Sequence, residues 1–315
     1  MKMKPTMDRG KNERLLPKIR ARWQIYLLLV LPLIYLLIFA YGPMGGLVIA
    51  FKRYNFGLGI FGSPWVGLEN FRRFFESYRF VQVLRNTLTL SFYSLLVNFP
   101  IPIFFALLLN AMPHKTYQKV IQTITYIPHF FSTVVMVGLI FQLLNNRNGL
   151  YGSLGLFLNR SMPADILAIG RYFKHIYVWS AVWQQTGYAS IIYFAALSNV
   201  DLSLHEAALV DGATRFQRLL HVDFPCILPT ANIMLILAVG GIMNVAFEKT
   251  LLMQNSLNIN FSEVISTYVY KVGLASGVND FSLSAAIGLF NSGVNFLLLM
   301  FANWGTKKLS GSGMF

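Results

Sequence analysis

The chain has 315 residues, of which 55% are hydrophobic and 12% charged, whereas a soluble domain carries about 25% charged residues. This composition excludes a soluble globular protein and predicts an integral membrane protein with one membrane domain, because apolar stretches recur with no long polar block between them. The single cysteine, Cys226, excludes an intramolecular disulfide, and the five histidines show no metal-binding spacing.

The N-terminal residues 1–22 are strongly basic and supply much of the net charge of +14. Such a segment beside a membrane span is typical of the cytoplasmic side, where it is attracted to anionic lipid. No folded basic module accompanies it, so nucleic-acid binding is not expected. The apolar stretch that follows is too long for a signal peptide and has no small-residue cleavage site, which predicts a retained anchor. The basic residues are Lys2, Lys4, Arg9, Lys11, Arg14, Lys18, Arg20 and Arg22.

Six stretches have the roughly 20 apolar residues that a transmembrane helix requires. They predict an all-α membrane domain over residues 23–304 with six transmembrane helices. An extension of the first helix through Gly42 and Pro43 to Phe51 stays open, because a proline kink is tolerated in membrane helices. The six stretches are Trp23–Tyr41, Leu84–Leu109, Val120–Leu144, Ile176–Leu197, Ile227–Phe247 and Leu283–Trp304.

An even number of spans places both termini on the same side, and the basic N-terminal segment indicates that this side is the cytoplasm. We therefore expect a cytoplasmic loop over residues 203–229 and a cytoplasmic tail over residues 305–315. The two sides hold nearly equal numbers of Lys and Arg when the N-terminal segment is included, and the other cytoplasmic segments hold fewer than the external loops, so the orientation depends on the N-terminal segment.

The first external loop predicts an amphipathic helix over Trp65–Tyr78 that lies at the membrane interface. Just before it, Gly57, Gly59 and Gly62 match the spacing of a dinucleotide-binding motif, but no βαβ pattern surrounds them, which favours a flexible loop. No phosphate-binding GxxxxGK[ST] motif occurs in the chain. If ATP drives this protein, another subunit binds the nucleotide.

Polar side chains lie within the apolar stretches, where contact with lipid is costly. Asn98, beside Pro100 and Pro102, predicts a kinked helix and either an interior-facing group or a hydrogen bond to a neighbouring helix. A second set carries neutral donors, acceptors and a ring suited to a polyhydroxylated sugar. This set predicts either a substrate path or contacts between helices: Gln184, Gln185, Tyr188, Asn244 and, near the membrane boundary, Glu248.

The cytoplasmic loop predicts a helix, a bend and a second helix. Ser203 and Glu206 have the spacing of a capping box at a helix start, and Gly212 permits a left-handed backbone at the bend. Pro225 and Pro229 are expected to end the second helix. From these residues alone, a plain capped surface loop and a docking loop remain equally good interpretations.

The sequence EAA at 206–208, followed by Gly212 and then by Val222-Asp223-Phe224-Pro225, resembles the EAA signature of permease subunits of binding-protein-dependent ABC importers. The resemblance covers nearly the whole chain. Within that family the sequence is similar to the oligosaccharide branch, especially to permeases for polysaccharide fragments. The segments that carry it are YGPMGGLVIAFKRYNF, GSPWVGLENFRRFF, NTLTLSF, VWQQTGYASIIYFAAL and SEVISTYVYKVGL.

The resemblance implies a type I ABC importer permease fold in a bacterial cytoplasmic membrane. It implies four kinds of partner: a second permease, two cytoplasmic ATPase subunits, an external solute-binding protein that is commonly a lipoprotein, and an oligosaccharide substrate. This chain itself would bind no cofactor and would not be an enzyme, since ATP and Mg²⁺ would be used by the partner ATPase. The residues that would dock on the ATPase are Glu206, Ala207, Ala208, Asp211 and Gly212.

Two other classes of membrane protein fit the sequence less well. An ion-coupled secondary transporter of small polar solutes is the alternative, but it would be expected to show internal repeats and buried ionisable residues. An intramembrane enzyme would require a catalytic cluster within a span, and none is evident. The residues leave open whether the sugar is acidic or neutral.

Overall fold

The computed structural model describes residues 23–158, 165–275, 277 and 279–310. The basic segment 1–22 and residues 311–315 of the predicted tail lie outside the described residues. Within the described ranges the chain is helical and has no β-strand, apart from an isolated antiparallel bridge between Lys52 and Trp65. The prediction of an all-α protein is therefore confirmed.

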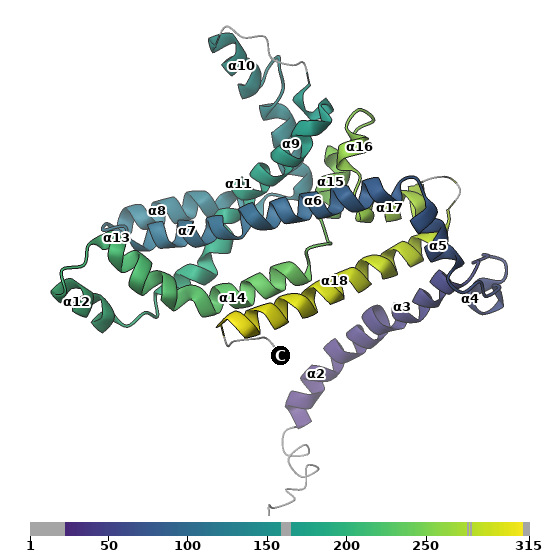
Figure 1. The fold of residues 1–315 in the computed structure, drawn as a ribbon, viewed down its shortest axis with the longest axis horizontal. Coiled ribbons are helices and arrows are strands. Elements are labelled where there is room, and N and C mark those ends of the chain that lie inside the picture. Colours follow the sequence, from purple (N-terminus) through teal and green to yellow (C-terminus); the bar gives the residue numbers. More distant parts are fainter. Residues whose placement is uncertain (1–22, 159–164, 276, 278, 311–315) are drawn as a thin grey trace, which may run out of the picture.

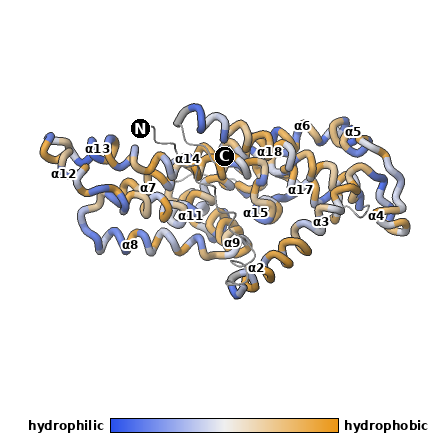
Figure 2. The backbone as a smooth tube through the Cα atoms, turned by 90° about the horizontal axis from the view of Figure 1, so that it is seen from below, coloured by the Kyte–Doolittle hydropathy of each residue, from blue (hydrophilic) through white to orange (hydrophobic). Residues whose placement is uncertain are grey.

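The first span is one continuous helical rod made of α2 (Trp23–Leu36), the π-helical η1 (Leu37–Tyr41), α3 (Gly42–Met44) and the 3-10 helix η2 (Gly45–Phe51). The wide turn of η1 precedes Pro43, which has no N–H for an ordinary helical bond. The first helix therefore does extend through Gly42 and Pro43 to Phe51, which the sequence had left open. The α2 end of this rod stands apart from the bundle in Figure 1, whereas η2 packs against α18, and most of α2 is coloured hydrophobic in Figure 2.

The loop after this rod holds the short helices α4 (Gly59–Gly62) and α5 (Glu69–Glu76). Gly59 has a φ of +67°, in agreement with a loop role for the glycine motif. The predicted interfacial helix over residues 65–78 is shorter and more buried than expected. Phe74 is 1% exposed, and the Asn70 amide donates to the carbonyls of Ala50 and Lys52 at 2.9 and 3.0 Å. α5 therefore packs against the protein with one face instead of lying wholly in the interface.

The second span consists of α6 (Phe80–Asn98) and α7 (Pro100–Asn110), which continue one another through Phe99. Pro100 occupies the first position of α7, where a helix requires no amide donor. The two helices form one stretch of 31 residues that is interrupted only at Phe99, and the predicted kink beside Asn98 stays a prediction.

The third predicted span, Val120–Leu144, is wrong as a continuous helix. The structure has α8 (Lys115–Tyr126), the 3-10 turn η3 (Ile127–Phe130) and α9 (Thr133–Leu143), with a bend of 104° between the two arms. Phe131 is extended, and the Ser132 hydroxyl accepts a hydrogen bond from the Val135 amide to start α9. Polar side chains of α11 contact the residues at this break.

The central helix of the bundle is α11 (Gly170–Leu197), which follows α10 (Leu150–Phe157) and the turn η4 (Ile166–Ala168). Its buried residues belong to two of the three apolar clusters: Phe173 and Tyr177 to one, Tyr193 and Leu197 to the other. Gly187 lies so close to α8 that a Cβ at this position would clash with the Thr125 carbonyl.

After α12 (Leu202–Val210) the chain forms α13 (Arg215–Arg218), the π-helical η5 (Leu219–Asp223) and α14 (Phe224–Gly240). These last three make one 26-residue helix, so the prediction that Pro225 and Pro229 end the helix is wrong. Pro225 lies in the first turn of α14, directly after the wide π-turn that frees it from donating a hydrogen bond.

The predicted fifth span extends too far, because α14 ends at Gly240 instead of Phe247. A Cβ on Gly240 would clash with Leu299 of α18 (Phe281–Ser310), which shows how closely the two helices approach. The Oδ1 of Asn295 on α18 accepts from the Met243 amide at 2.9 Å and so satisfies the backbone that leaves the helix.

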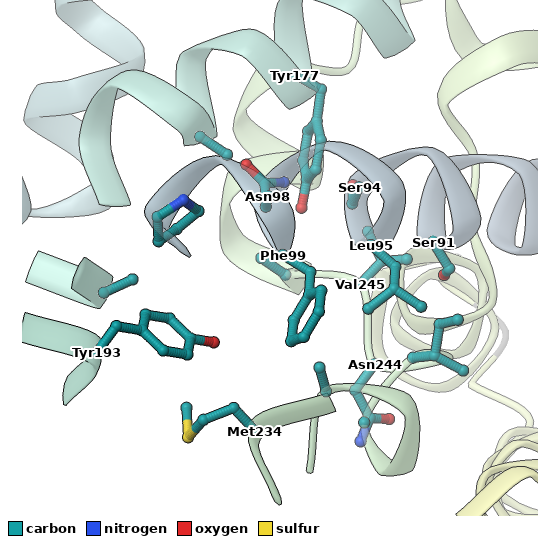
Figure 3. A pocket seen from close by; sticks show the side chains of 17 residues that line it. Ser91, Ser94, Leu95, Asn98, Phe99, Tyr177, Tyr193, Met234, Asn244 and Val245 are labelled. Carbon is teal, nitrogen blue, oxygen red and sulfur yellow. The ribbon is translucent and has the colours of Figure 1, made fainter. Parts of the chain in front are cut away.

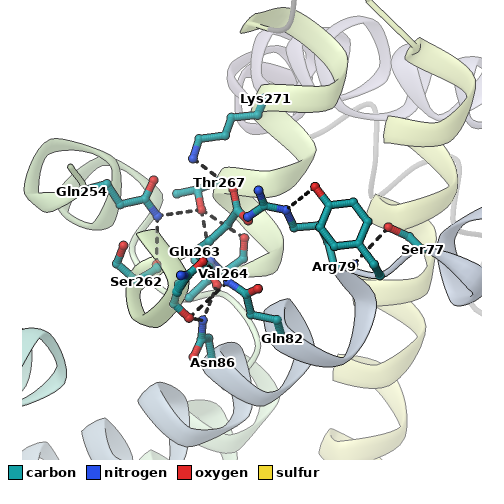
Figure 4. A network of polar contacts seen from close by, with 12 residues as sticks. Ser77, Arg79, Gln82, Asn86, Gln254, Ser262, Glu263, Val264, Thr267 and Lys271 are labelled. Carbon is teal, nitrogen blue, oxygen red and sulfur yellow. Dashed lines mark hydrogen bonds and ion pairs between the residues drawn. The ribbon is translucent and has the colours of Figure 1, made fainter. Parts of the chain in front are cut away.

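The segment before α18 contains α15 (Phe247–Met253), α16 (Ile259–Ser262), α17 (Ile265–Tyr270) and η6 (Lys271–Ala275). A buried polar network fixes it to the start of α6 (Figure 4). Glu263 is 3% exposed and pairs with Arg79 and Lys271, each at 3.0 Å. Sequence reasoning missed this network, because its members are distant in the sequence.

Four helices of the described chain are long and apolar enough to cross a membrane, and the bent pair α8–α9 is a fifth if it counts as one span. α11 has 28 residues but is more polar, since Gln184 and Gln185 lie near its middle. The four helices are Tyr26–Phe51, Phe80–Asn110, Arg215–Gly240 and Phe281–Gly305. In Figure 1 most of them run lengthwise, with α12 at one end and α5 and α17 towards the other.

Candidate functional site

The loop that carries the EAA sequence begins with a helix capped by Asp201. The Oδ1 of Asp201 accepts from the Ser203 amide at 2.9 Å, so α12 starts at Leu202 and the predicted capping box of Ser203 and Glu206 is wrong. Hydrogen bonds from Ser203 lower the pKa of Asp201 below its ordinary value. An ionised aspartate is a strong N-cap because it also complements the positive end of the helix, and it displaces the serine from that role.

Gly212 forms the predicted bend and has a φ of +79°. The Ala213 amide donates to the Ala208 carbonyl at 2.8 Å, and the Gly212 amide donates to the Leu209 carbonyl at 3.1 Å. This is the pair of bonds of a Schellman motif, which requires a left-handed residue and therefore favours glycine. The prediction of a bend at Gly212 is confirmed.

A capping box does exist in this loop, at the start of the second helix. The Thr214 amide donates to Gln217 Oε1 at 2.8 Å, and the Gln217 amide donates to Thr214 Oγ1 at 3.3 Å. This capping box could have been predicted from the sequence, because Thr and Gln stand three residues apart shortly after a glycine. Together the two motifs fix the angle between α12 and α13.

One buried carboxylate attaches this loop to the bundle. Asp223 is 6% exposed, and its Oδ1 lies 3.3 Å from His205 Nε2 and accepts from Asn110 Nδ2 at 3.3 Å. His205 is on α12, Asn110 ends α7, and Asp223 precedes α14. Side-chain contacts of Asp223 therefore connect α12 with the end of α7 and the start of α14.

The outer surface of α12 has no partner within the described chain. The helix contains no buried residue, and Leu209 and Val210 are 55% and 88% exposed. Of the five predicted docking residues, four are exposed and Ala208 is partly buried. They lie together on α12 and on the turn that ends it: Glu206, Ala207, Ala208, Asp211 and Gly212.

A cavity of about 360 Å³ lies between α6, α7, α11 and α14 (Figure 3). Apolar residues such as Phe99 and Met234 form much of its wall, and Asn98, Tyr177, Tyr193 and Asn244 add polar groups. Ser91 and Ser94 line it from α6.

Two polar atoms of the cavity wall are buried and have no hydrogen-bond partner in the described structure: Ser91 Oγ and Asn98 Oδ1. A buried unpaired acceptor costs about 1–3 kcal/mol. The expected alternative of a hydrogen bond from a neighbouring helix is thus not observed for Asn98 Oδ1.

The structure separates the predicted substrate-path residues. Asn244 lines the cavity, and its Oδ1 accepts from Asn291 and Asn295 of α18 at 3.2 and 3.1 Å. Glu248 is exposed on α15 and has no ion-pair partner among the described residues.

The other three lie on α11 beside the break between α8 and α9. Gln184 donates through Nε2 to the Phe131 carbonyl at 3.3 Å, and Gln185 Oε1 lies 2.8 Å from His129 Nδ1. Tyr188 stacks on His129 with ring centroids 3.7 Å apart. They hold the bent pair in place, and none of the three is among the residues that line the cavity.

No group of three or more His, Cys, Asp and Glu in the described part of the chain could hold a metal ion.

Comparison with known proteins places this geometry in a family. Residues 98–311 match the family described as binding-protein-dependent transport system inner membrane component. The chain is 39% identical to protein LplB of Bacillus subtilis, covering 99% of this chain and 97% of LplB. It is 40% identical to the polygalacturonan/rhamnogalacturonan transport system permease protein YteP of the same organism, covering 97% and 94%.

Solved structures agree with this match. The fold is similar to a chain of a bacterial ABC transporter involved in the import of the acidic polysaccharide alginate, with a TM-score of 0.86, 36% identity and coverage of 95% of this chain and all of that one. A structure of the alginate transporter with its alginate pentasaccharide-bound periplasmic protein gives a TM-score of 0.87, again at 36% identity. The resemblance inferred from the EAA sequence is confirmed, and the chain belongs to the family of binding-protein-dependent transport system inner membrane components.

Proposed function

We propose that this chain is the membrane-spanning permease subunit of an ATP-driven importer of oligosaccharides in a bacterial cytoplasmic membrane. It forms the translocation path with a second permease and receives its substrate from an external solute-binding protein or lipoprotein. The four apolar helices, the bent pair α8–α9 and α11 make six spans. Both termini then lie in the cytoplasm, on the same side as α12.

The observation that carries the proposal is the uncovered helix α12 and its attachment to the bundle. Exposed Leu209 and Val210 offer an apolar docking face, and the contact of His205 with Asp223 connects that face to the membrane helices. The chain contains no phosphate-binding loop, so two cytoplasmic partner subunits bind ATP and Mg²⁺. Their closure on ATP pushes α12, and the rigid Gly212 turn transmits the push.

The substrate path combines the cavity of Figure 3 with the interface to the second permease. The cavity offers neutral donors and acceptors next to aromatic rings, which suits a sugar better than an ion. The printed names of the relatives YteP and of the alginate importer refer to polysaccharide substrates. This supports an oligosaccharide as the substrate class and the chain as a transport subunit without enzymatic activity of its own.

Affinity purification of the tagged chain from its native membrane tests the assembly. We expect a second permease and an ATPase to co-purify, and we expect Val210→Asp to lose the ATPase, because the charge falls in the centre of the docking face. Phe61→Asp is the matched control, since Phe61 is 97% exposed at the opposite end of the molecule. Retention of the ATPase by Val210→Asp, or uptake by proteoliposomes that depends on an ion gradient and not on ATP, would overturn the proposal.

A further inference from the structure

A second, strongly basic cleft of about 580 Å³ lies at the end of the bundle away from α12. The first two turns of α6, the first turn of α11 and the helix α16 enclose it. In the orientation proposed above, this end faces the outside of the cell. The cleft shares no lining residue with the cavity between α6, α11 and α14.

Three cations line the cleft and no acidic residue does: Arg85, Arg171 and Lys174. None of the three has an ion pair among the described residues. Lys174 Nζ donates only to the neutral hydroxyl of Thr89, and Arg171 Nη2 donates to the Tyr172 hydroxyl at 3.2 Å. Three positive charges that share one cleft repel each other, and an anion between them would remove that cost.

The nearby acid cannot neutralise these cations, because it already has two partners. Glu263 of the network in Figure 4 is paired on one oxygen with Arg79 and on the other with Lys271. The positive charge of the cleft is therefore available to a ligand.

The wall of the cleft is held in place by hydrogen bonds between its two sides. Asn86 is 5% exposed, and its Nδ2 donates to the carbonyls of Asn260 and Glu263 at 2.9 and 3.1 Å. Gln82 Nε2 also donates to the Asn260 carbonyl, at 3.1 Å. The loop of α16 is thus fixed against α6, so the cleft is a built feature of the fold.

The remaining lining residues match the surface of a sugar. Tyr78 and Phe261 are 83% and 48% exposed and provide flat rings against which the apolar face of a pyranose packs. Gln82 and Asn260 also line the cleft and add amide groups to its wall. Guanidinium groups bind carboxylates with two parallel hydrogen bonds, which selects a planar carboxylate over a hydroxymethyl group.

We propose that this cleft binds the carboxylates of an acidic oligosaccharide as it enters the transporter, which deepens the proposed function and rests on it. A concave site of this volume, with rings and amides beside the cations, fits a small charged sugar better than a broad protein surface. The chain therefore selects uronate-containing fragments in addition to any selection by the external binding protein.

Binding to the complete complex, held in phosphatidylcholine nanodiscs without the solute-binding protein, tests this assignment. The probes are the trimer of galacturonate and the galactose trimer of the same linkage, in which each carboxylate is replaced by a hydroxymethyl group. We expect the wild type to prefer the acidic trimer by about tenfold or more, with a preference that weakens as salt increases.

The double variant Arg85→Gln/Arg171→Gln should lose most of this preference, and the charge-conserving Arg85→Lys should keep part of it. Lys115→Gln/Lys119→Gln is the matched control, because it removes the same charge from α8, outside the cleft. We expect this control to bind both trimers as the wild type does.

Equal affinity of the wild type for the two trimers, or unchanged affinity of the Arg85/Arg171 double variant, would overturn the proposal. Two other results would also overturn the proposal. If the double variant lost only the enrichment of phosphatidylglycerol from mixed nanodiscs, the cleft would be a lipid site. If it lost only affinity for the solute-binding protein, the cleft would be a docking surface for that protein. A wild type that brings along no ATPase contradicts the proposed function, whereas an assembled complex without carboxylate preference contradicts the cleft alone.

Discussion

His205 Nε2 lies 3.3 Å from Asp223 Oδ1, and this contact joins an otherwise exposed helix to the bundle. Because α12 buries no residue of its own, it is held by few contacts besides the chain that enters and leaves it. The pair of His205 and Asp223 therefore connects the proposed docking surface to the membrane helices.

The first prediction concerns this link. Asp223→Asn keeps the shape of the side chain but weakens its contacts with His205 and Asn110. A loosened α12 transmits less of the ATPase motion, so we expect uptake to fall by about fivefold or more, as is typical of lost coupling between sites. ATP hydrolysis should persist. Uptake and hydrolysis are measured in the same proteoliposomes.

His114→Gln serves as the control for Asp223→Asn, because His114 is exposed in the turn between α7 and α8 and contacts neither α12 nor Asp223. It should leave both rates unchanged. Equal ratios of uptake to hydrolysis in Asp223→Asn and the wild type would show that α12 transmits motion by another route.

The second prediction concerns the turn at Gly212. No atom lies within 4 Å of a Cβ added there, so Gly212→Val acts through its φ of +79° and not through a clash. A left-handed conformation costs an ordinary residue about 1–2 kcal/mol, and more for a β-branched one. We expect Gly212→Val to assemble in the membrane but to hydrolyse ATP with little uptake.

Gly212→Asn should transport better than Gly212→Val, because asparagine tolerates the left-handed region. Gly138→Ala on α9, which has free space and no positive φ, is a neutral control. Full uptake by Gly212→Val would mean that the Schellman turn does not carry the coupling.

Local signals predicted some parts of this fold well. The bend at Gly212 was predictable, because glycine suits the left-handed backbone that the turn requires. The first helix continues to Phe51 because a π-turn next to Pro43 compensates for the amide that proline lacks. The cap at Asp201 and the box of Thr214 and Gln217 were also local, but Ser203 and Glu206 offered a competing match. A stronger cap two residues earlier prevailed.

Features that depend on distant residues were not predictable. The break at Phe131 lies in an apolar stretch, and its carbonyl is satisfied by Gln184, more than 50 residues away. The end of α14 at Gly240 likewise depends on Asn295 of α18. For the candidate site, polar residues within spans could be recognised, but hydropathy does not reveal which of them line a cavity and which hold helices together.

The third prediction concerns Gln184, for which the contacts favour a structural role. Gln184→Ala leaves the Phe131 carbonyl without its donor, which costs about 1–3 kcal/mol. We expect a lower thermal unfolding midpoint of the purified complex and an unchanged preference among oligosaccharides. Gln142→Ala removes an exposed amide on α9 and should change neither quantity. A changed substrate preference in Gln184→Ala would return this residue to the substrate path.

The fourth prediction concerns Asn98, whose Oδ1 is buried at the cavity wall without a partner. If the amide were kept for stability, Asn98→Leu would destabilise the complex. Because the acceptor is already unpaired, an apolar side chain of similar volume should leave the unfolding midpoint unchanged or raise it. We infer that opening of the cavity during transport exposes this acceptor to a substrate hydroxyl, so we expect uptake to fall about tenfold. Asn232→Leu, on α14 outside the cavity lining, is the control and should transport normally. The contrary result is a lower unfolding midpoint together with undiminished uptake by the folded Asn98→Leu complex. It would show that Asn98 contributes to packing and that the substrate crosses elsewhere.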